Sequence, residues 1–176
     1  TATCPSFDRF IQSVACYEPT VIQLLWEVIG YILSPDFGAK NFFVFCGVPN
    51  SGKSVLANVL SKLIGSSCVS SLSVEDFAKN FTLSNLIGKH LNVYMDLPDS
   101  RITPEAVGKL KMLTGGDRVT TDVKYRDPVS FRNTAKLLFG SNFEIKYSKD
   151  TALHQRMISV PFNYSVPKEE QNPDLS

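Results

Sequence analysis

The chain has 176 residues, of which 43% are hydrophobic and 20% are charged, and its formal net charge is +1 at pH 7. This composition excludes a disordered or fibrous chain, and the length predicts one domain with a sizeable core. The longest apolar stretch, residues 21–33, contains Gln23 and Glu27 and is too short to span a bilayer, so no membrane partner is expected.

Helices are predicted for the first part of the chain. Apolar residues recur at helical spacing over residues 6–15 and 18–33. The turn-forming sequence SPDFGAK, residues 34–40, ends the second helix. We therefore assign residues 1–38 to an N-terminal helical region.

From residue 39 onward, short apolar runs alternate with helical patterns. The runs are typical of strands buried on both faces of a parallel sheet, and they lie at residues 41–46, 67–71, 90–95, 135–142 and 156–162. Helices are predicted between them, at residues 54–64, 73–81 and 103–113. Ser73 and Asp76 form a capping-box pattern at the start of the second of these. The order predicts an α/β domain over residues 39–163, with helices on both faces of a parallel-sheet core and a polar tail at 164–176.

One segment carries the positive charge. Seven Lys and Arg side chains and three Asp fall within residues 109–136, a net charge of +4, which leaves −3 for the rest of the chain. Within it, residues 117–133 alternate around a turn and predict an inserted β-hairpin. The turn holds Lys124, Tyr125 and Arg126, whose charges and aromatic ring suit phosphate contact and base stacking. A solvated β-turn is the alternative interpretation.

The segment GVPNSGKS follows the first predicted strand of the sheet and opens a helix. It fits the pattern G-x-x-x-x-G-K-[ST], in which the glycines let backbone N–H groups face a phosphate chain. Lys53 is expected to reach the β- and γ-phosphates of a nucleotide, and the Ser54 hydroxyl is expected to hold Mg²⁺. The predicted nucleotide-binding residues are Gly47, Val48, Pro49, Asn50, Ser51, Gly52, Lys53 and Ser54.

Polar residues follow two other predicted strands. Asp96 comes directly after the apolar run LNVYM, where an acid for the metal and the attacking water belongs. Asp99, three residues on, either supplies a second carboxylate or is a turn residue. Asn142 ends the run KLLFGSN and either orients the attacking water or is a capping or turn asparagine. Since ligands of open α/β sheets lie beyond the carboxyl ends of the strands, Asp96 and Asn142 are expected at one site.

Neither a disulfide framework nor a zinc site is expected, because no CxxC spacing occurs among the cysteines Cys4, Cys16, Cys46 and Cys68. Cys46 ends an apolar run and is expected to be a small buried hydrophobic residue. This use of cysteine fits a reducing, cytoplasmic setting.

Several blocks together resemble the helicase domain of phage and plasmid primase-helicases, which belong to superfamily 3 within the AAA+ ATPases. SFDRF and IGYILSP are similar to the short helical region before the P-loop in that family, and GVPNSGKS resembles its Walker A motif. KMLTGGD, KYRDPVSF and AKLLFGSN are similar to its most distinctive block, and HQRMISVPF to its terminal arginine-plus-strand motif. The resemblance spans most of the chain and implies an AAA+-like P-loop fold.

The resemblance also implies roles for the residues at matching positions. Lys53 and Ser54 would be Walker A residues, Asp96 Walker B and Asn142 sensor 1. Arg156 would be an arginine finger that reaches the γ-phosphate on a neighbouring subunit. The family implies an ATP-driven helicase that works as a homo-oligomeric ring, usually a hexamer, on single-stranded DNA or a forked duplex, in a bacterial cell or a phage-infected host. The predicted hairpin would line the central channel and grip the DNA.

The chain departs from the family at one point. Many members have adjacent acids at Walker B, whereas Leu97 follows Asp96 here, so the catalytic base is either Asp96 or Asp99. Two other functions stay open: a P-loop kinase that acts on a small molecule, and a nucleotide-gated DNA-binding or assembly module with little turnover. The sequence holds no arginine-rich lid of the kind that a kinase needs.

Overall fold

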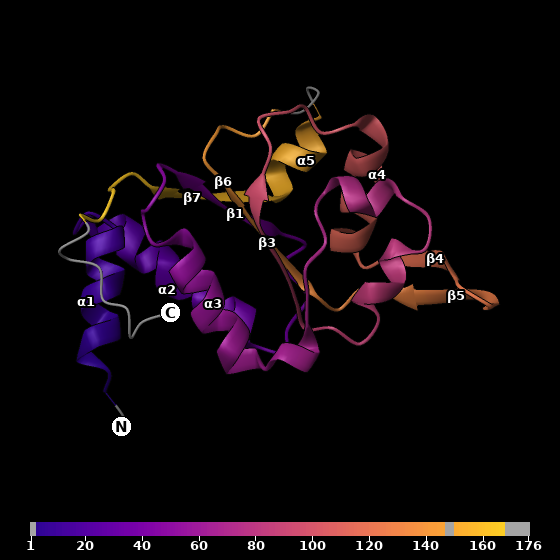
Figure 1. Ribbon diagram of the computed structural model, residues 1–176, viewed down its shortest axis with the longest axis horizontal. Helices are drawn as coiled ribbons and strands as arrows, with labels where there is room; N and C mark the ends of the chain where they lie inside the picture. Colours follow the sequence, from indigo (N-terminus) through magenta and orange to yellow (C-terminus); the bar gives the residue numbers. More distant parts are fainter. Residues whose placement is uncertain (1–2, 147–149, 168–176) are drawn as a thin grey trace.

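A computed structural model describes residues 3–146 and 150–167 of the chain. Its main sheet has five strands, all parallel, in the order β2-β3-β6-β1-β7 (Figure 1). The strands are β1 (Phe42–Gly47), β2 (Val69–Ser70), β3 (Leu91–Leu97), β6 (Lys136–Ser141) and β7 (Met157–Phe162). The predicted α/β fold with a parallel-sheet core is confirmed.

Helices cover both faces of this sheet, as predicted (Figure 1). One face is covered by α1 (Pro5–Val14), α2 (Pro19–Leu33) and α3 (Lys53–Ile64). The other face is covered by α4 (Pro104–Gly115), α5 (Thr151–Arg156) and the 3₁₀ turns η2 (Glu75–Ala78) and η3 (Thr82–Leu86). A further 3₁₀ turn, η1 (Ser66–Cys68), links α3 to β2.

The side chains of β1 alternate between two cores. Phe43 and Phe45 pack with α1, α2 and α3, whereas Phe42 and Val44 pack with α4 and the 3₁₀ turns. All four are at most 2% exposed. A continuous apolar run therefore marks a central strand here, because successive side chains point to opposite faces and both faces are covered.

Two side chains from the start of β3 and β6 fasten α2 to the sheet. Lys136 is 3% exposed, its Nζ donates to the Ser34 carbonyl just after α2, and this nitrogen lies 4.1 Å from the centre of the Phe37 ring. The Nε2 atom of His90 lies 2.8 Å from the carbonyl oxygen of Ile32. A cation at the carboxyl end of a helix is favoured by the helix dipole. These contacts join the N-terminal helical region to the amino edge of the sheet.

The predicted hairpin is present and projects from the body of the protein (Figure 1). Its strands, β4 (Arg118–Val123) and β5 (Arg126–Arg132), pair antiparallel. Val119 is fully buried and roots β4 in the core beneath α4. Tyr125, at the turn, is fully exposed and has a φ angle of 62°. The hairpin therefore has a buried root and a solvent-facing tip.

Two elements differ from the prediction. The helix predicted over residues 73–81 is only the 3₁₀ turn η2, although Ser73 and Asp76 do exchange the two hydrogen bonds of a capping box. Thr82 Oγ1 donates to the carbonyls of Asp76 and Lys79, acceptors that a longer helix would use. The sequence does not predict α5, because its six residues are too few to give a periodic pattern.

Within the described ranges, no helix is long and apolar enough to cross a membrane. All four cysteines are free thiols. Cys46 is half-buried rather than buried, and its thiol donates to the carbonyl of Phe143 at 3.3 Å. Most of the predicted polar tail, residues 168–176, lies outside the described residues.

Candidate functional site

The loop between β1 and α3 carries the predicted P-loop, residues 47–54, and close contacts account for its glycines. A Cβ atom on Gly47 would lie 2.0 Å from the carbonyl oxygen of Phe162, because β7 ends beside the loop. The same oxygen accepts from the backbone N–H of Val48 at 3.1 Å. A Cβ atom on Gly52 would lie 2.8 Å from Cγ1 of Val14, and Gly52 has a φ angle of 90°. Only glycine fits at either position.

Lys53 points back into this loop. It is 7% exposed, and its Nζ donates to the carbonyls of Gly47 at 2.9 Å and Val48 at 2.6 Å, and to Oγ of Ser51 at 3.2 Å. Burial lowers the pKa of Lys53, and the nearby Cys46 opposes that shift. The P-loop thus encloses the Lys53 ammonium, and a positive charge of this kind attracts phosphate groups.

The first turn of α3 offers further hydrogen-bond donors, in addition to the Lys53 ammonium. Gly52 is the N-cap and has no side chain to accept from the N–H groups of that turn. Ser54, the second residue of α3, is exposed. Free N–H groups and the positive end of the helix dipole attract anions. Donors, an ammonium group and a hydroxyl therefore gather at one helix start.

Three neighbouring strands end at the same level beside the P-loop. In the register of the sheet, Ser141 of β6 is paired with Cys46 of β1 on one side and with Leu97 of β3 on the other. Asp96 and Asn142 adjoin this row, and both are exposed. Since adjacent strands lie about 4.8 Å apart, the backbone of Asp96 is ~10 Å from the start of the loop. The structure therefore brings the P-loop, Asp96 and Asn142 to one edge of the sheet.

β3 has a bulge at the predicted acid. Tyr94 pairs with Phe139 and Leu97 pairs with Ser141, so β3 has one more residue than β6 over this stretch. Bulges of this kind re-aim a side chain at the end of a strand. Asp96 lies within the bulge and is exposed, while Leu97 is buried. The carboxylate of Asp96 is therefore directed to the solvent side of the sheet edge.

Asp99 is engaged elsewhere. Its carboxylate forms an ion pair with Lys146 at 2.6 Å, between two exposed side chains. The carbonyl of Lys146 also accepts from the backbone N–H of Ile102 at 2.9 Å. These contacts close the loop after β3 against the loop after β6. Of the two predicted acids, Asp96 is the one at the strand end beside the P-loop.

Arg156 lies at the opposite edge of the sheet. It ends α5 just before β7 begins, and its carbonyl accepts from Nδ2 of Asn41, just before β1. Its Nη1 donates to Oγ1 of Thr114 at 3.0 Å and to the Lys111 carbonyl, both in α4. Because β1 and β7 are parallel, the amino edge that holds Arg156 faces away from the P-loop of the same chain.

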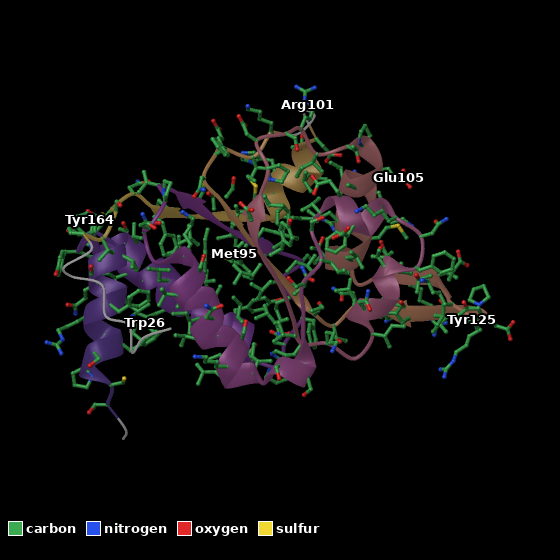
Figure 2. All side chains as sticks on the ribbon, viewed as in Figure 1. Trp26, Met95, Arg101, Glu105, Tyr125 and Tyr164 are labelled. Atoms are coloured by element: carbon green, nitrogen blue, oxygen red, sulfur yellow. The ribbon has the colours of Figure 1, made fainter. Side chains whose placement is uncertain are left out.

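The predicted DNA-binding residues also lie apart from the P-loop. They form the hairpin tip, and all are exposed: Lys124, Tyr125 and Arg126. Figure 2 shows Tyr125 at the far end of the molecule from Tyr164, and Val166, two residues after Tyr164, donates to the carbonyl of Asn50 in the P-loop. The candidate nucleotide site and the candidate DNA site are thus two separate regions.

Sequence reasoning misses two segments that hold the P-loop. In α1, Phe10 and Val14 pack against Gly52. A Cβ atom on Gly52 would lie 3.1 and 3.3 Å from two ring carbons of Phe10. After β7, the backbone N–H of Val166 donates to the carbonyl of Asn50 at 2.9 Å. In the sequence these segments are only a helical stripe and the start of a polar tail, so neither signals a contact with the P-loop.

A family match covers most of this arrangement. Residues 45–156 match DUF5906, described as a family of unknown function. The chain belongs to the DUF5906 family. The matched part of this DUF5906 chain includes the P-loop, Asp96, the hairpin, Asn142 and Arg156.

Solved structures share the fold of this DUF5906 chain. The apo structure of the NrS-1 C-terminal region has a TM-score of 0.78 at 17% identity, and its A form has 0.77 at 15% identity; each match covers 99% of this chain and 42% of that one. JCV helicase with a bound phenylacetamide compound has a TM-score of 0.62 at 17% identity, over 93% of this chain and 46% of that one. The chain thus spans less than half the length of these structures, and the likeness shows the fold.

Proposed function

We propose that this DUF5906 chain is the motor domain of an ATP-dependent DNA helicase or translocase. It hydrolyses ATP with Mg²⁺ and moves along single-stranded DNA in the replication of a phage, plasmid or other mobile element. The observation that carries the proposal is the buried Lys53 ammonium, held inside the P-loop at the edge where Asp96 and Asn142 lie.

The residues at this edge divide the work of hydrolysis. Lys53 and the free N–H groups of the first α3 turn bind the β- and γ-phosphates. Asn142 orients the attacking water, and Asp96 accepts its proton. No covalent intermediate is needed, because positioning and charge stabilisation supply most of the catalysis in phosphoryl transfer.

The donor set fits Mg²⁺. The Ser54 hydroxyl and the Asp96 carboxylate are hard oxygen ligands, and both residues are exposed at the P-loop edge. Mg²⁺ is usually held by one or two protein oxygens together with phosphates and water, rather than by an all-protein cage. The described residues contain no cluster of three or more His, Cys, Asp or Glu, which agrees with that mode of binding. The metal would neutralise charge on the β- and γ-phosphates.

The fold neighbours support the helicase part of the proposal. One of them is a helicase by its own name, JCV helicase, with a TM-score of 0.62 to this chain. The resemblance of the sequence blocks to superfamily 3 primase-helicases points the same way. The exposed hairpin with Lys124, Tyr125 and Arg126 provides the cations and the ring that single-stranded DNA requires.

The position of Arg156 supports a ring assembly. Because this residue lies at the edge opposite the P-loop, its natural nucleotide target is on a second copy of the chain. An arginine supplied by a neighbour raises the rate of NTP hydrolysis by several orders of magnitude where it is used. We place six copies in a homo-oligomeric ring around the DNA, in the cytoplasm of the host cell.

The experiment measures ATP hydrolysis with and without single-stranded DNA over a range of protein concentrations. Stimulation by DNA and a rise of specific activity with concentration are expected. Lys53→Ala should abolish hydrolysis, while Lys62→Ala, which changes an exposed lysine on the same helix, should not. Specific activity that is equal at all dilutions would contradict the shared active site.

Two other results would replace the proposal. Phosphate transfer to a small molecule, with no response to DNA, would favour a kinase. Nucleotide-dependent DNA binding with negligible turnover would favour an assembly module.

A further inference from the structure

The root of the β4–β5 hairpin is held by contacts between α4 and α5. Arg156 donates from Nη1 to Oγ1 of Thr114 at 3.0 Å and to the Lys111 carbonyl. In the opposite direction, Lys111 donates from Nζ to Oδ2 of Asp150 at 2.7 Å, and Asp150 caps α5 by accepting from the backbone N–H of Leu153. We call Lys111, Thr114, Asp150 and Arg156 the α4–α5 latch.

The last turn of α4 is shaped to receive the guanidinium group. A Cβ atom on Gly115 would lie only 3.3 Å from Nη1 of Arg156, so glycine lets the two helices approach closely. The buried Thr114 hydroxyl donates to the Leu110 carbonyl at 2.8 Å, which leaves its lone pairs to accept from Arg156. Packing against α5 thus explains Thr114 and Gly115, while Gly116 is explained by its φ angle of 77° at the C-cap of α4.

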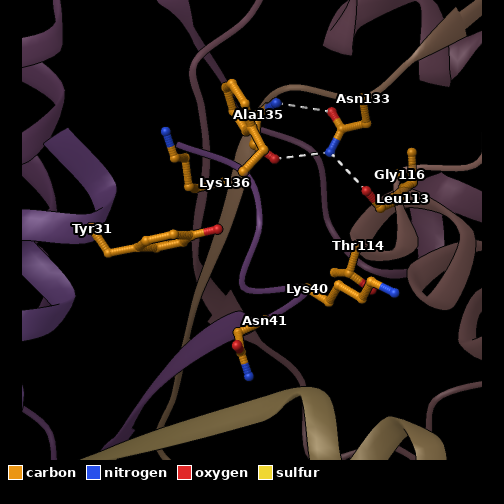
Figure 3. Close-up of a pocket in the computed structure, with 10 residues that line it drawn as sticks. Tyr31, Lys40, Asn41, Leu113, Thr114, Gly116, Asn133, Ala135 and Lys136 are labelled. Carbon is orange, nitrogen blue, oxygen red and sulfur yellow. Dashed lines mark hydrogen bonds between the residues drawn. The ribbon is translucent and has the colours of Figure 1, made fainter. Parts of the chain in front are cut away.

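The same turn carries both ends of the hairpin. The latch residue Thr114 lies in the last turn of α4 and β4 begins at Arg118, so three residues separate the latch from the first strand. β5 ends at Arg132, and the next residue, Asn133, donates from Nδ2 to the Leu113 carbonyl at 3.2 Å (Figure 3). A movement of the last turn of α4 therefore displaces the roots of both strands.

We propose that the α4–α5 latch holds the hairpin in one position, and that it opens when Arg156 leaves α4 for the phosphates of a nucleotide on a second copy of the chain. This inference rests on the proposed function, in which Arg156 faces a neighbour. The guanidinium is planar and binds phosphate best through two parallel N–H groups, so it has to turn away from α4 to do so. The nucleotide bound to one copy thereby determines whether the hairpin of the next copy is held or released.

The two positions of Arg156 compete, so weakening the latch favours the other position. The population of each state follows the relative affinity of the guanidinium for α4 and for the neighbour's phosphates. In this scheme Thr114 is a positioning residue that touches neither nucleotide nor DNA. Thr114→Ser keeps the hydroxyl that Arg156 binds, and Thr114→Val lacks it.

The first experiment measures amide hydrogen exchange in the full chain for Thr114→Val and Thr114→Ser. Thr114→Val removes the acceptor at nearly constant volume, so exchange over residues 111–132 should become at least about threefold faster. Thr114→Ser keeps the acceptor and should match the wild type. Ser61→Ala removes a hydroxyl that donates within α3 at 2.8 Å, and serves as the control. Unchanged exchange over 111–132 in Thr114→Val would overturn the latch.

A second variant covers the case in which Thr114→Val does not fold. Asp150→Asn keeps the cap of α5, because asparagine caps helices as well as aspartate does, but it weakens the pair with Lys111. It should give the same local increase in exchange over residues 111–132. Exchange that rises equally in α1, α2 and α3 would indicate general loosening and would count against the latch.

The second experiment measures the protein concentration that gives half-maximal ATP hydrolysis. Loss of one hydrogen bond to a charged group should lower this concentration about five- to tenfold in Thr114→Val, and Thr114→Ser should restore it. Faster exchange with an unchanged midpoint would overturn the competition with a second copy. Absence of hydrolysis in the wild type as well would refute the proposed function and the competition with it, while the exchange result would still decide whether the latch holds the hairpin.

Discussion

The ammonium nitrogen of Lys53 lies 2.6 Å from the carbonyl oxygen of Val48, five residues earlier, so the loop that precedes α3 closes around its own cation. This contact is made while the side chain is 7% exposed, and burial lowers the pKa of the group. A cation held in this way lies where a bound triphosphate would need it. All three ammonium hydrogens have acceptors within the loop, so a triphosphate would have to replace at least one of these acceptors to bind Lys53.

Lys53→Met should therefore lower the affinity for Mg·ATP by at least about tenfold, because the variant keeps the buried stem but loses the charge. Titration with a fluorescent ATP analogue measures this affinity, and circular dichroism checks that the fold is kept. Lys62→Met, on the exposed side of the same helix, is the matched control. Equal affinities of the two variants would remove Lys53 from the nucleotide site.

The contact between α1 and the P-loop can be measured with two glycines that share a backbone conformation. Gly52 has φ and ψ angles of 90° and 0°, and Gly116, the C-cap of α4, has 77° and 17°. A Cβ atom at Gly52 would meet Val14 at 2.8 Å, whereas nothing lies within 4 Å of one at Gly116. Gly116→Ala thus reports the conformational cost alone, about 1–2 kcal/mol, and Gly52→Ala should cost about 1–3 kcal/mol more. Urea unfolding measures both values.

A double variant tests whether the extra cost comes from α1. Val14→Ala removes the methyl group that a Gly52 side chain would meet, so adding it to Gly52→Ala should recover part of the lost stability. The coupling energy between the two sites should be at least about 0.5 kcal/mol. Strictly additive effects would show that α1 does not hold the P-loop.

The sequence predicts those parts of the site that depend on short-range pattern. The P-loop is a local motif between a buried run and a helical run, and both flanks follow from side-chain periodicity. The bulge at Asp96 could not be predicted, because it depends on the register between β3 and β6. The contacts of Phe10 with Gly52 and of Arg156 with Thr114 join residues far apart in the chain, and neither pair has a spacing that signals it. Packing between elements, rather than propensity within them, determines these features.

The role of the acid can be assigned with two matched substitutions. Asp96→Asn should lower the rate of ATP hydrolysis at least about a hundredfold and leave nucleotide binding nearly unchanged, because the amide keeps the shape but loses the charge and the proton acceptor. Asp99→Asn should change the rate less than about threefold, since its carboxylate is paired with Lys146 in solvent. Single-turnover hydrolysis at saturating ATP separates the two. A larger effect at Asp99 would make that residue the catalytic base.

The hairpin tip offers a test that distinguishes charge from stacking. Lys124→Ala should weaken binding of single-stranded DNA and make its salt dependence shallower by about one unit of slope, because one phosphate contact is lost. Tyr125→Ala should weaken binding by about 1–3 kcal/mol without changing the slope, since stacking involves no counterion. Fluorescence anisotropy at several salt concentrations measures both. Unaltered affinity in both variants would leave the hairpin as a solvated turn, and basal ATP hydrolysis should be kept in each.

The last prediction concerns Lys136, which joins the sheet to the end of α2. Burial lowers the pKa of Lys136 below its usual 10.5, with a smaller opposing effect from Asp36. Between its folded pKa and 10.5, the unfolded chain binds more protons than the folded chain at this group, so this group's contribution to the free energy of unfolding rises with pH. Lys136→Met has no group that titrates here, and it leaves the Ser34 carbonyl without its donor. The lost hydrogen bond should make the variant less stable at neutral pH by about 1–3 kcal/mol. The stability difference between wild type and variant should grow as pH rises through that window. Burial also lowers the pKa of Lys53, but this residue is present in both proteins, so its contribution cancels. Urea unfolding between neutral pH and pH 10.5 measures the difference; a difference that does not change with pH would show that Lys136 is not held as a buried cation.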